Sequence, residues 1–265
     1  MMPDFRNASG TPEEDAGEKT MTWVGHLAEL RRRLLSTFVF FVLAFAVLYP
    51  FADRILDALL MPLARAMNET GGSQPVIFTG LAEGFISHLK LAGFGAALLT
   101  FPFFAAQVWL YVSPGLYADE RAFLRPFFWI APVLFLAGGL FVFFVMMPLA
   151  FRFLLGFQQL SSSAVHLPVV LEARLAEYLS FLTTLILAFG VCFQLPVVLV
   201  VLARLGLLTA DTLVAARRYA VVLIFVLAAV VTPPDIISQF GLALPLLILY
   251  EAAIWCIRRV EKKEN

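Results

Sequence analysis

The sequence predicts an all-α membrane protein with six transmembrane helices in a curved bundle and both termini in the cytoplasm. Hydrophobic residues make up 61% of the 265-residue chain and charged residues only 14%, and the mean hydropathy is +0.89. That is more apolar surface than one soluble core can bury, so the chain needs lipid as a solvent. Prolines inside four of the apolar stretches would bend those helices and curve the bundle: Pro102, Pro132, Pro196 and Pro245.

A helix needs about 20 predominantly apolar residues to cross the hydrocarbon core of a bilayer. We expect the six spans at residues 34–50, 85–112, 122–149, 175–205, 219–231 and 240–257. The fifth stretch is too short to cross unless the bilayer thins locally or the helix includes flanking residues. We therefore predict a thinned bilayer or a water-filled dent beside the fifth and sixth spans.

The basic residues indicate how the chain is oriented. With both termini inside, the inner segments hold 14 of the 19 lysines and arginines. The outer segments hold the other five: Arg54, Arg65, Lys90, Arg152 and Arg174. This bias satisfies the positive-inside rule and predicts cytoplasmic termini. Residues 1–20 are predicted to be a disordered cytoplasmic tail, 21–258 the transmembrane domain and 259–265 a second cytoplasmic tail.

Local structure can also be predicted for three segments outside the apolar cores of the spans. Residues 21–36 read as an amphipathic helix that would lie in the inner interface before turning into the membrane. Residues 53–67, in the long first outer loop, have a helical pattern. With the loop at 150–174 they could form a cap on the outer side, or the two segments could be solvated loops. Pro233 and Pro234 are expected to end the fifth helix, and Asp235 to begin the sixth after a tight turn.

The sequence contains no motif for catalysis or phosphate binding, and His26, His88 and His166 are scattered. We therefore expect neither an active site, nor a metal site, nor a cofactor. The net charge of zero gives no reason to expect nucleic acid as a partner. Cys192 and Cys256 both fall in predicted spans, where a cysteine is usually a small apolar side chain.

Polar residues inside spans are costly and usually face the bundle or a cavity. Gln194 lies about midway through the fourth span, whereas Gln107 and Glu251 lie nearer the inner surface. Gln194 could contact a partner helix, or it could form a hydrogen bond that holds this bundle together. Glu251 could pair with Arg258, one to two turns away.

Motifs spread over about residues 22–258 resemble the TatC family, the polytopic subunit of the twin-arginine protein translocase. In order they are His26-Leu27-x-Glu29-Leu30-Arg31, Gln107-Val108-Trp109, Pro114-Gly115-Leu116-Tyr117 with Glu120-Arg121, Tyr178-Leu179-Ser180-Phe181, Ala188-Phe189-Gly190, Pro196 and Thr232-Pro233-Pro234-Asp235. Each motif is modest alone, but their order and spacing are highly specific.

The resemblance implies a six-helix, cupped receptor for signal peptides that carry two consecutive arginines. It implies transport of folded proteins across the bacterial cytoplasmic (inner) membrane, driven by the proton-motive force, with the single-span partners TatA and TatB and with other copies of the chain. The family's signal-peptide site corresponds to Glu29 and Glu120, and Arg31 belongs to the same first motif. The family often has a glutamate where this chain has Gln194.

The residues themselves support such a site. Two adjacent arginines need two acceptors on rigid elements, because a guanidinium pairs bidentately with a carboxylate. Simpler interpretations remain open: Glu29 could form an i,i+4 pair with Arg33, and Glu120 could be an acid favoured in the first turn of a helix. The main alternative function is a proton-coupled small-molecule transporter that uses Gln194 and kinked helices, followed by a structural membrane scaffold.

Overall fold

The computed structural model describes residues 23–69, 76–115, 117–156, 174–231 and 236–264. Within these ranges the chain is helical, and the one β contact is an isolated bridge between Ile77 and Arg174. The helices are α1 (Trp23–Leu48), α2 (Ala52–Glu69), α3 (Glu83–Val112), α4 (Ala118–Phe141), α5 (Met147–Gly156), α6 (Leu175–Cys192), α7 (Leu195–Arg204), α8 (Ala210–Val231) and α9 (Ile236–Glu264). A π-helical turn, Val142–Met146, joins α4 to α5.

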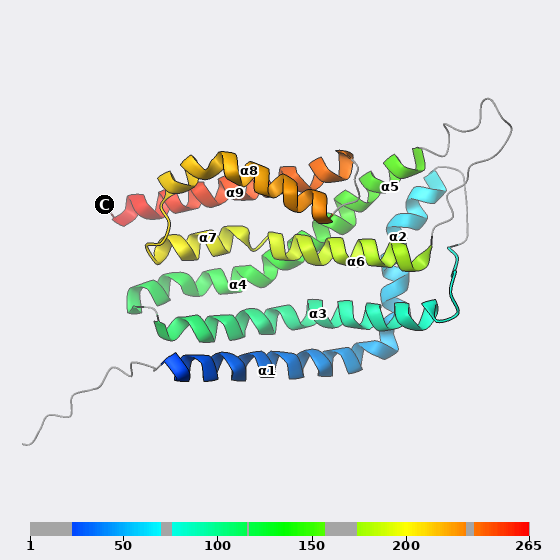
Figure 1. Ribbon diagram of the computed structural model, residues 1–265, viewed down its shortest axis with the longest axis horizontal. Helices are drawn as coiled ribbons and strands as arrows, with labels where there is room; N and C mark the ends of the chain where they lie inside the picture. Colours follow the sequence, from blue (N-terminus) through cyan, green and yellow to red (C-terminus); the bar gives the residue numbers. More distant parts are fainter. Residues whose placement is uncertain (1–22, 70–75, 116, 157–173, 232–235, 265) are drawn as a thin grey trace, which may run out of the picture.

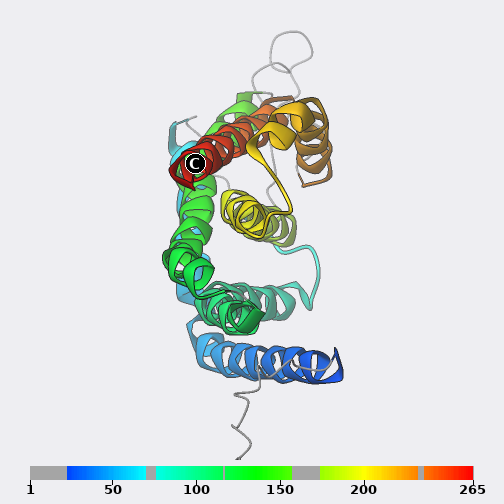
Figure 2. The same ribbon diagram turned by 90° about the vertical axis from the view of Figure 1, so that its left-hand side faces the viewer.

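Six helical segments are long and apolar enough to cross a membrane, which confirms the predicted number of spans within the described ranges. They are formed by α1 with α2, α3, α4 with α5, α6 with α7, α8, and α9, and in the first of them α1 is the part that runs alongside the other spans (Figure 1). Seen from one end, they form an arc with a concave side (Figure 2). The start of α1, the α3–α4 connection and the end of α9 lie at one end of the molecule (Figure 1), which we call the terminal end. The opposite end is the far end.

The first span departs from the prediction. The interfacial helix at 21–36 is not separate, because α1 runs without interruption from Trp23 to Leu48. Its sequence has no proline and no glycine after Gly25 that would turn the chain. The turn comes instead at the far end, where Pro50 lies in a short 3₁₀ helix, Tyr49–Phe51, between α1 and α2.

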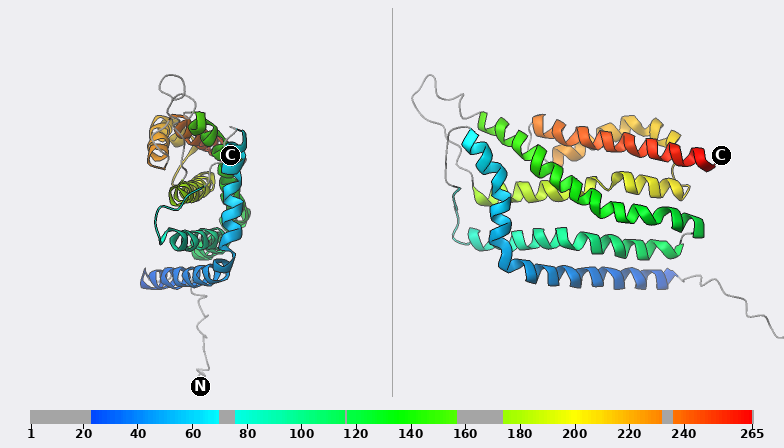
Figure 3. Two further views of the ribbon diagram at one scale, coloured as in Figure 1. Left: turned by 90° about the vertical axis from the view of Figure 1, so that its right-hand side faces the viewer. Right: turned by 180° about the vertical axis from the view of Figure 1, so that it is seen from behind.

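The helical pattern at 53–67 is confirmed by α2, which crosses the far end of the bundle (Figures 1 and 3). Its residues Leu59, Leu63 and Ala66 are buried in the main core, together with side chains from the spans. One half of the predicted outer cap is therefore a packed helix. Most of the other half, 157–173, lies outside the described residues, as do Pro233, Pro234 and Asp235.

The fourth and fifth spans also differ in detail from the expectation. The fourth is broken at Phe193 and Gln194, with Pro196 in the first turn of α7. The fifth begins at Ala210 rather than Tyr219 and is 22 residues long, because α8 includes Asp211, Arg217 and Arg218. Even so, α8 and α9 stop short of the far end that α3 and α6 reach (Figure 1). The predicted thinning of the bilayer beside them stays a prediction.

Small residues let α4 and α6 approach closely at the centre of the bundle. A Cβ atom on Gly138 would lie 2.8 Å from the backbone oxygen of Phe189, and one on Gly190 would lie 2.6 Å from the ring of Phe135. Such close backbone approach is typical of helix pairs in membranes, where packing rather than the hydrophobic effect holds helices together.

Candidate functional site: a carboxylate pocket at the terminal end

An open pocket of ≈ 670 Å³ lies at the terminal end between α1 and α3. Its walls come mainly from one stripe of α1, because Ala28, Arg32 and Ser36 follow each other at steps of four and therefore share one helix face. Glu29 and Arg33 line the pocket beside this stripe, and Gln107 of α3 closes it from the opposite side.

A chain of polar contacts crosses the pocket from α1 to α3. The Arg33 Nε donates a hydrogen bond to Glu29 Oε1 at 3.0 Å, and Arg33 Nη2 also contacts that oxygen. The Arg33 Nη1 donates to Gln107 Oε1 at 3.3 Å. The pair of Glu29 with Arg33 confirms the simpler interpretation of Glu29, but Gln107 joins it from 74 positions further along the chain. Gln107 therefore lies at this pocket.

Only one of the two Glu29 carboxylate oxygens is used in this network. The Glu29 side chain is 17% exposed, and its Oε2 atom is buried with no hydrogen-bond partner among the described residues. A buried charged oxygen without a partner is costly. A cationic donor that reached the pocket would remove this cost, so the site has an acceptor ready for one.

The structure does not place the other two predicted site residues, Glu120 and Arg31, in the pocket. Glu120 lies in the first turn of α4, which starts at the same end of the molecule as α1 (Figure 1). Its side chain is outside what the structure describes, so the pairing of Glu29 with Glu120 stays a prediction. Arg31 is exposed and is not among the residues that line the pocket.

Sequence reasoning missed several features of this site. The ring of His26 stacks on Tyr111 of α3, with centroids 4.3 Å apart, and Arg32 and Ser36 line the pocket. The four-residue steps from Ala28 could have pointed to the latter two. No local pattern could have paired His26 with Tyr111, because that contact depends on how α1 packs against α3.

Gln194 lies at the break between α6 and α7, far from this pocket in the chain. Its Nε2 donates a hydrogen bond to the backbone oxygen of Ala131 in α4 at 2.9 Å. Of the two roles considered for Gln194, the structure shows the hydrogen bond within the bundle. A contact of Gln194 with a partner helix stays a prediction. The predicted contact of Glu251 with Arg258 is replaced by an ion pair with Arg217 of α8, at 2.6 Å.

The fold and the pocket define a multi-pass helical membrane protein with a carboxylate-lined pocket at one end of its spans. Residues 25–245 match the family model of the Sec-independent protein translocase protein TatC. The chain is 42% identical over 236 residues to the Sec-independent protein translocase protein TatC of Rickettsia prowazekii (strain Madrid E), covering 89% of this chain and 92% of that one. It is 39% identical over 246 residues to the protein of the same name from Magnetococcus marinus, covering 93% and 87%.

Two solved structures agree with this result. The crystal structure of the twin-arginine translocase receptor TatC superposes with a TM-score of 0.73 at 31% identity, covering 87% of this chain and 96% of that one. The same receptor in the detergent DDM gives a TM-score of 0.76 at 31% identity, covering 88% and 99%. This chain belongs to the TatC family. The family is a component of a protein translocase and not an enzyme.

Proposed function

We propose that this chain is the core subunit of a twin-arginine translocase and binds signal peptides that carry two consecutive arginines. The observation that carries the proposal is the buried, unpartnered Oε2 of Glu29 in an open pocket at the terminal end. The family and the twin-arginine receptor structures support it. A small-molecule transporter is not favoured, because Gln194, its predicted midplane group, is already bonded to the backbone of α4.

The proposal includes partners and a location. The chain would work in the bacterial cytoplasmic (inner) membrane and use the proton-motive force to help folded proteins across. It would assemble with the single-span subunits TatA and TatB and with further copies of itself. Gln194 and Gln107 are proposed contacts for partner helices, and Arg31 is proposed to join Glu29 and Glu120 in the peptide site.

The geometry of the pocket suits one arginine of the peptide. Arg33 holds the Glu29 carboxylate through Oε1. Oε2 is buried in this arrangement, and a second guanidinium would reach it once the side chains around it move. A planar guanidinium with several donors can use that oxygen and a neighbouring acceptor together. Glu120, at the start of α4, would supply the acceptor for the adjacent arginine.

The first prediction concerns these two carboxylates. The Glu29→Gln and Glu120→Gln variants keep shape and remove charge, and each should weaken binding of a twin-arginine peptide by about 1.5–3 kcal/mol, the range for a charge-assisted hydrogen bond. Replacing the peptide's arginines with lysines should also weaken binding. That loss should shrink in the glutamine variants, because part of the partner is already gone. Peptide titration in nanodiscs measures all three effects.

Glu177→Gln is the matched control, since Glu177 is an exposed glutamate at the start of α6, at the far end of the molecule. It should bind the peptide like the unmodified protein. Strictly additive losses in the double-mutant cycle would mean that Glu29 and Glu120 act only on the shape of the protein, and the proposed peptide site would be wrong.

The second prediction concerns which side of the membrane the termini and loops face. In a background without Cys192 and Cys256, single cysteines at Ser9, Asp119 and Asp211 should resist an impermeant thiol reagent added outside intact cells. Cysteines at Ser73 and Ser162 should react with it. The physical reason is the excess of basic residues on the segments assigned to the cytoplasm. Labelling of the cysteine at Asp119 from outside would reverse the assigned sides.

A further inference from the structure

The Glu29 carboxylate, the proposed acceptor for a peptide arginine, is already occupied by an arginine of this chain. Its Oε1 accepts a hydrogen bond from Arg33 Nε at 3.0 Å and also contacts Nη2 of the same side chain. Its Oε2 is buried and has no hydrogen-bond partner in the described part of the chain. We propose that Arg33 is a built-in competitor that masks Glu29, and that a peptide arginine binds by displacing it. This inference rests on the peptide site proposed above.

Neither oxygen of Glu29 is open to an arriving guanidinium while the side chains stay as they are. A carboxylate oxygen offers about two acceptor positions, and on Oε1 both are used by nitrogens of one guanidinium. Oε2 has acceptor positions left, but it is buried. The side chains of Glu29 and Arg33 are only 17% and 21% exposed. Displacement of the Arg33 side chain would free Oε1 without any change in the backbone.

The charges in the pocket oppose a cationic ligand as long as Arg33 stays in place. Among the described residues that line it, Glu29 is acidic, whereas Arg32 and Arg33 are basic. The lining therefore has no excess of negative charge, and two further arginines would meet like charges at short range. When a peptide arginine takes the place of Arg33, one ion pair replaces another and the carboxylate keeps a cationic partner.

The Arg33 side chain can leave Glu29 at low cost. Ion pairs between residues four apart on one helix are weak. The Arg33 Nη1 already donates to Gln107 Oε1 of α3 at 3.3 Å, so the displaced side chain keeps an acceptor on the neighbouring helix. A peptide with a second arginine for Glu120 gains one more ion pair, whereas a single cation only exchanges one pair for another. The competitor therefore keeps single basic side chains from binding tightly.

The test titrates the full chain in nanodiscs with a synthetic peptide that carries two consecutive arginines. Arg33→Met removes the charge and the donors but leaves a long side chain. It should raise peptide affinity about twofold to fivefold, the range expected when a weak competing ion pair is removed. Arg33→Lys should give a smaller gain, since an ammonium still competes but lacks the planar fork. A purely structural role for Arg33 would lower the affinity instead.

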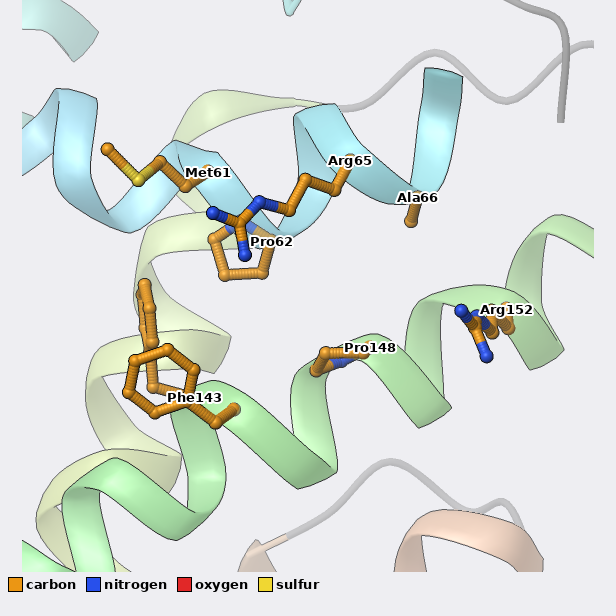
Figure 4. A pocket seen from close by; sticks show the side chains of 8 residues that line it. Met61, Pro62, Arg65, Ala66, Phe143, Pro148 and Arg152 are labelled. Carbon is orange, nitrogen blue, oxygen red and sulfur yellow. The ribbon is translucent and has the colours of Figure 1, made fainter. Parts of the chain in front are cut away.

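The gain in affinity must depend on Glu29. In a protein that also carries Glu29→Gln, Arg33→Met should leave the affinity nearly unchanged, because no carboxylate remains to be unmasked. Arg32→Met is the matched control: it removes the same charge from the same pocket, but the bonds to Glu29 come from Arg33. Its effect should be equal with and without Glu29→Gln. Arg65→Met is a remote control without effect, since Arg65 lines a pocket at the far end (Figure 4).

The results separate this inference from the proposed function. If Glu29→Gln alone leaves peptide affinity unchanged, the proposed peptide site is wrong, and the competitor with it. If Glu29→Gln weakens binding but Arg33→Met does not strengthen it, the site stands and the competitor is refuted. An equal gain in the Glu29→Gln background would also refute it, because the lost charge alone would then explain the gain. Should Arg33→Met fail to fold, Arg33→Lys takes its place, and no gain in that variant overturns the proposal.

Discussion

Replacing Glu83 with alanine is expected to destabilise the protein strongly. Glu83 is 9% exposed, and both of its carboxylate oxygens are used. Oε2 accepts hydrogen bonds from the backbone nitrogens of Thr79, at 2.6 Å, and Gly80, at 3.0 Å. It also accepts one from the Thr79 hydroxyl, at 3.1 Å. Oε1 accepts one from the backbone nitrogen of Ala176, at 3.0 Å.

The effect should be large because this one carboxylate links two spans. Glu83 is the first residue of α3, whereas Ala176 lies in the first turn of α6, where backbone N–H groups have no partner within the helix. The alanine variant would leave these donors without their acceptor, and a lost partner costs more than the bond itself contributed. Glu83→Gln should be intermediate, because its amide keeps one acceptor oxygen.

Thermal unfolding in detergent measures the effect, with Glu177→Ala as the control. Glu177 is also in the first turn of α6, but its side chain is 72% exposed, and among the described residues it pairs with Arg174, at 3.2 Å. Exposed pairs of this kind contribute little to stability. We expect a fall of several degrees in melting temperature for Glu83→Ala and almost none for Glu177→Ala. Equal melting temperatures for the two variants would show that the link between α3 and α6 does not stabilise the fold.

The second large effect is expected from Gly138→Ala in α4. The new Cβ atom would lie 2.8 Å from the backbone oxygen of Phe189 and 3.0 Å from Cγ of Phe193. Backbone cannot move aside as a flexible side chain can, so α4 and α6 would have to separate. Inserting one carbon into a packed interior typically costs about 1–3 kcal/mol, and here it would also strain the hydrogen bond from Gln194 to Ala131.

Gly93→Ala in α3 makes the same chemical change where there is room. Its Cβ atom would meet only the ring of Phe45, at 4.0 Å. The Gly93→Ala protein should be as stable as the unmodified protein, or more stable by up to about 1 kcal/mol, because alanine has a higher helix propensity than glycine. Unfolding by a denaturing detergent, followed by circular dichroism, compares the two. A Gly138→Ala protein as stable as Gly93→Ala would refute the close contact between α4 and α6.

The spans could be predicted from the sequence because apolar runs report directly on lipid exposure, and the pattern at 53–67 predicted α2. The start of α8 was missed because Asp211, Arg217 and Arg218 break the apolar run but not the helix. The helix predicted at 21–36 is present as the start of α1, but the predicted turn between it and the first span was wrong, because amphipathic spacing does not reveal whether the chain turns. Turning needs a local breaker, and the first one after Gly25 is Pro50.

The site was predictable in part. Glu29 and Arg33 are four residues apart, and that spacing alone brings them together on a helix. The contact with Gln107 depends on the packing of α1 against α3, which no local pattern contains. Glu83 was not considered at all. In sequence it looks like an ordinary first-turn acid, and its partner Ala176 lies 93 positions away.

The crossing of α2 makes the two ends of the arc mechanically different. At the far end, α2 lies against α3 and α5 and its side chains enter the main core. At the terminal end, no helix of the described chain runs across the ends of the spans (Figures 1 and 3). At the far end α2 therefore ties α3 to α5, whereas at the terminal end the described spans are held by their contacts with one another. We therefore expect a ligand that enters the carboxylate pocket to move α1 and α3 apart more easily than it would move the helices at the far end.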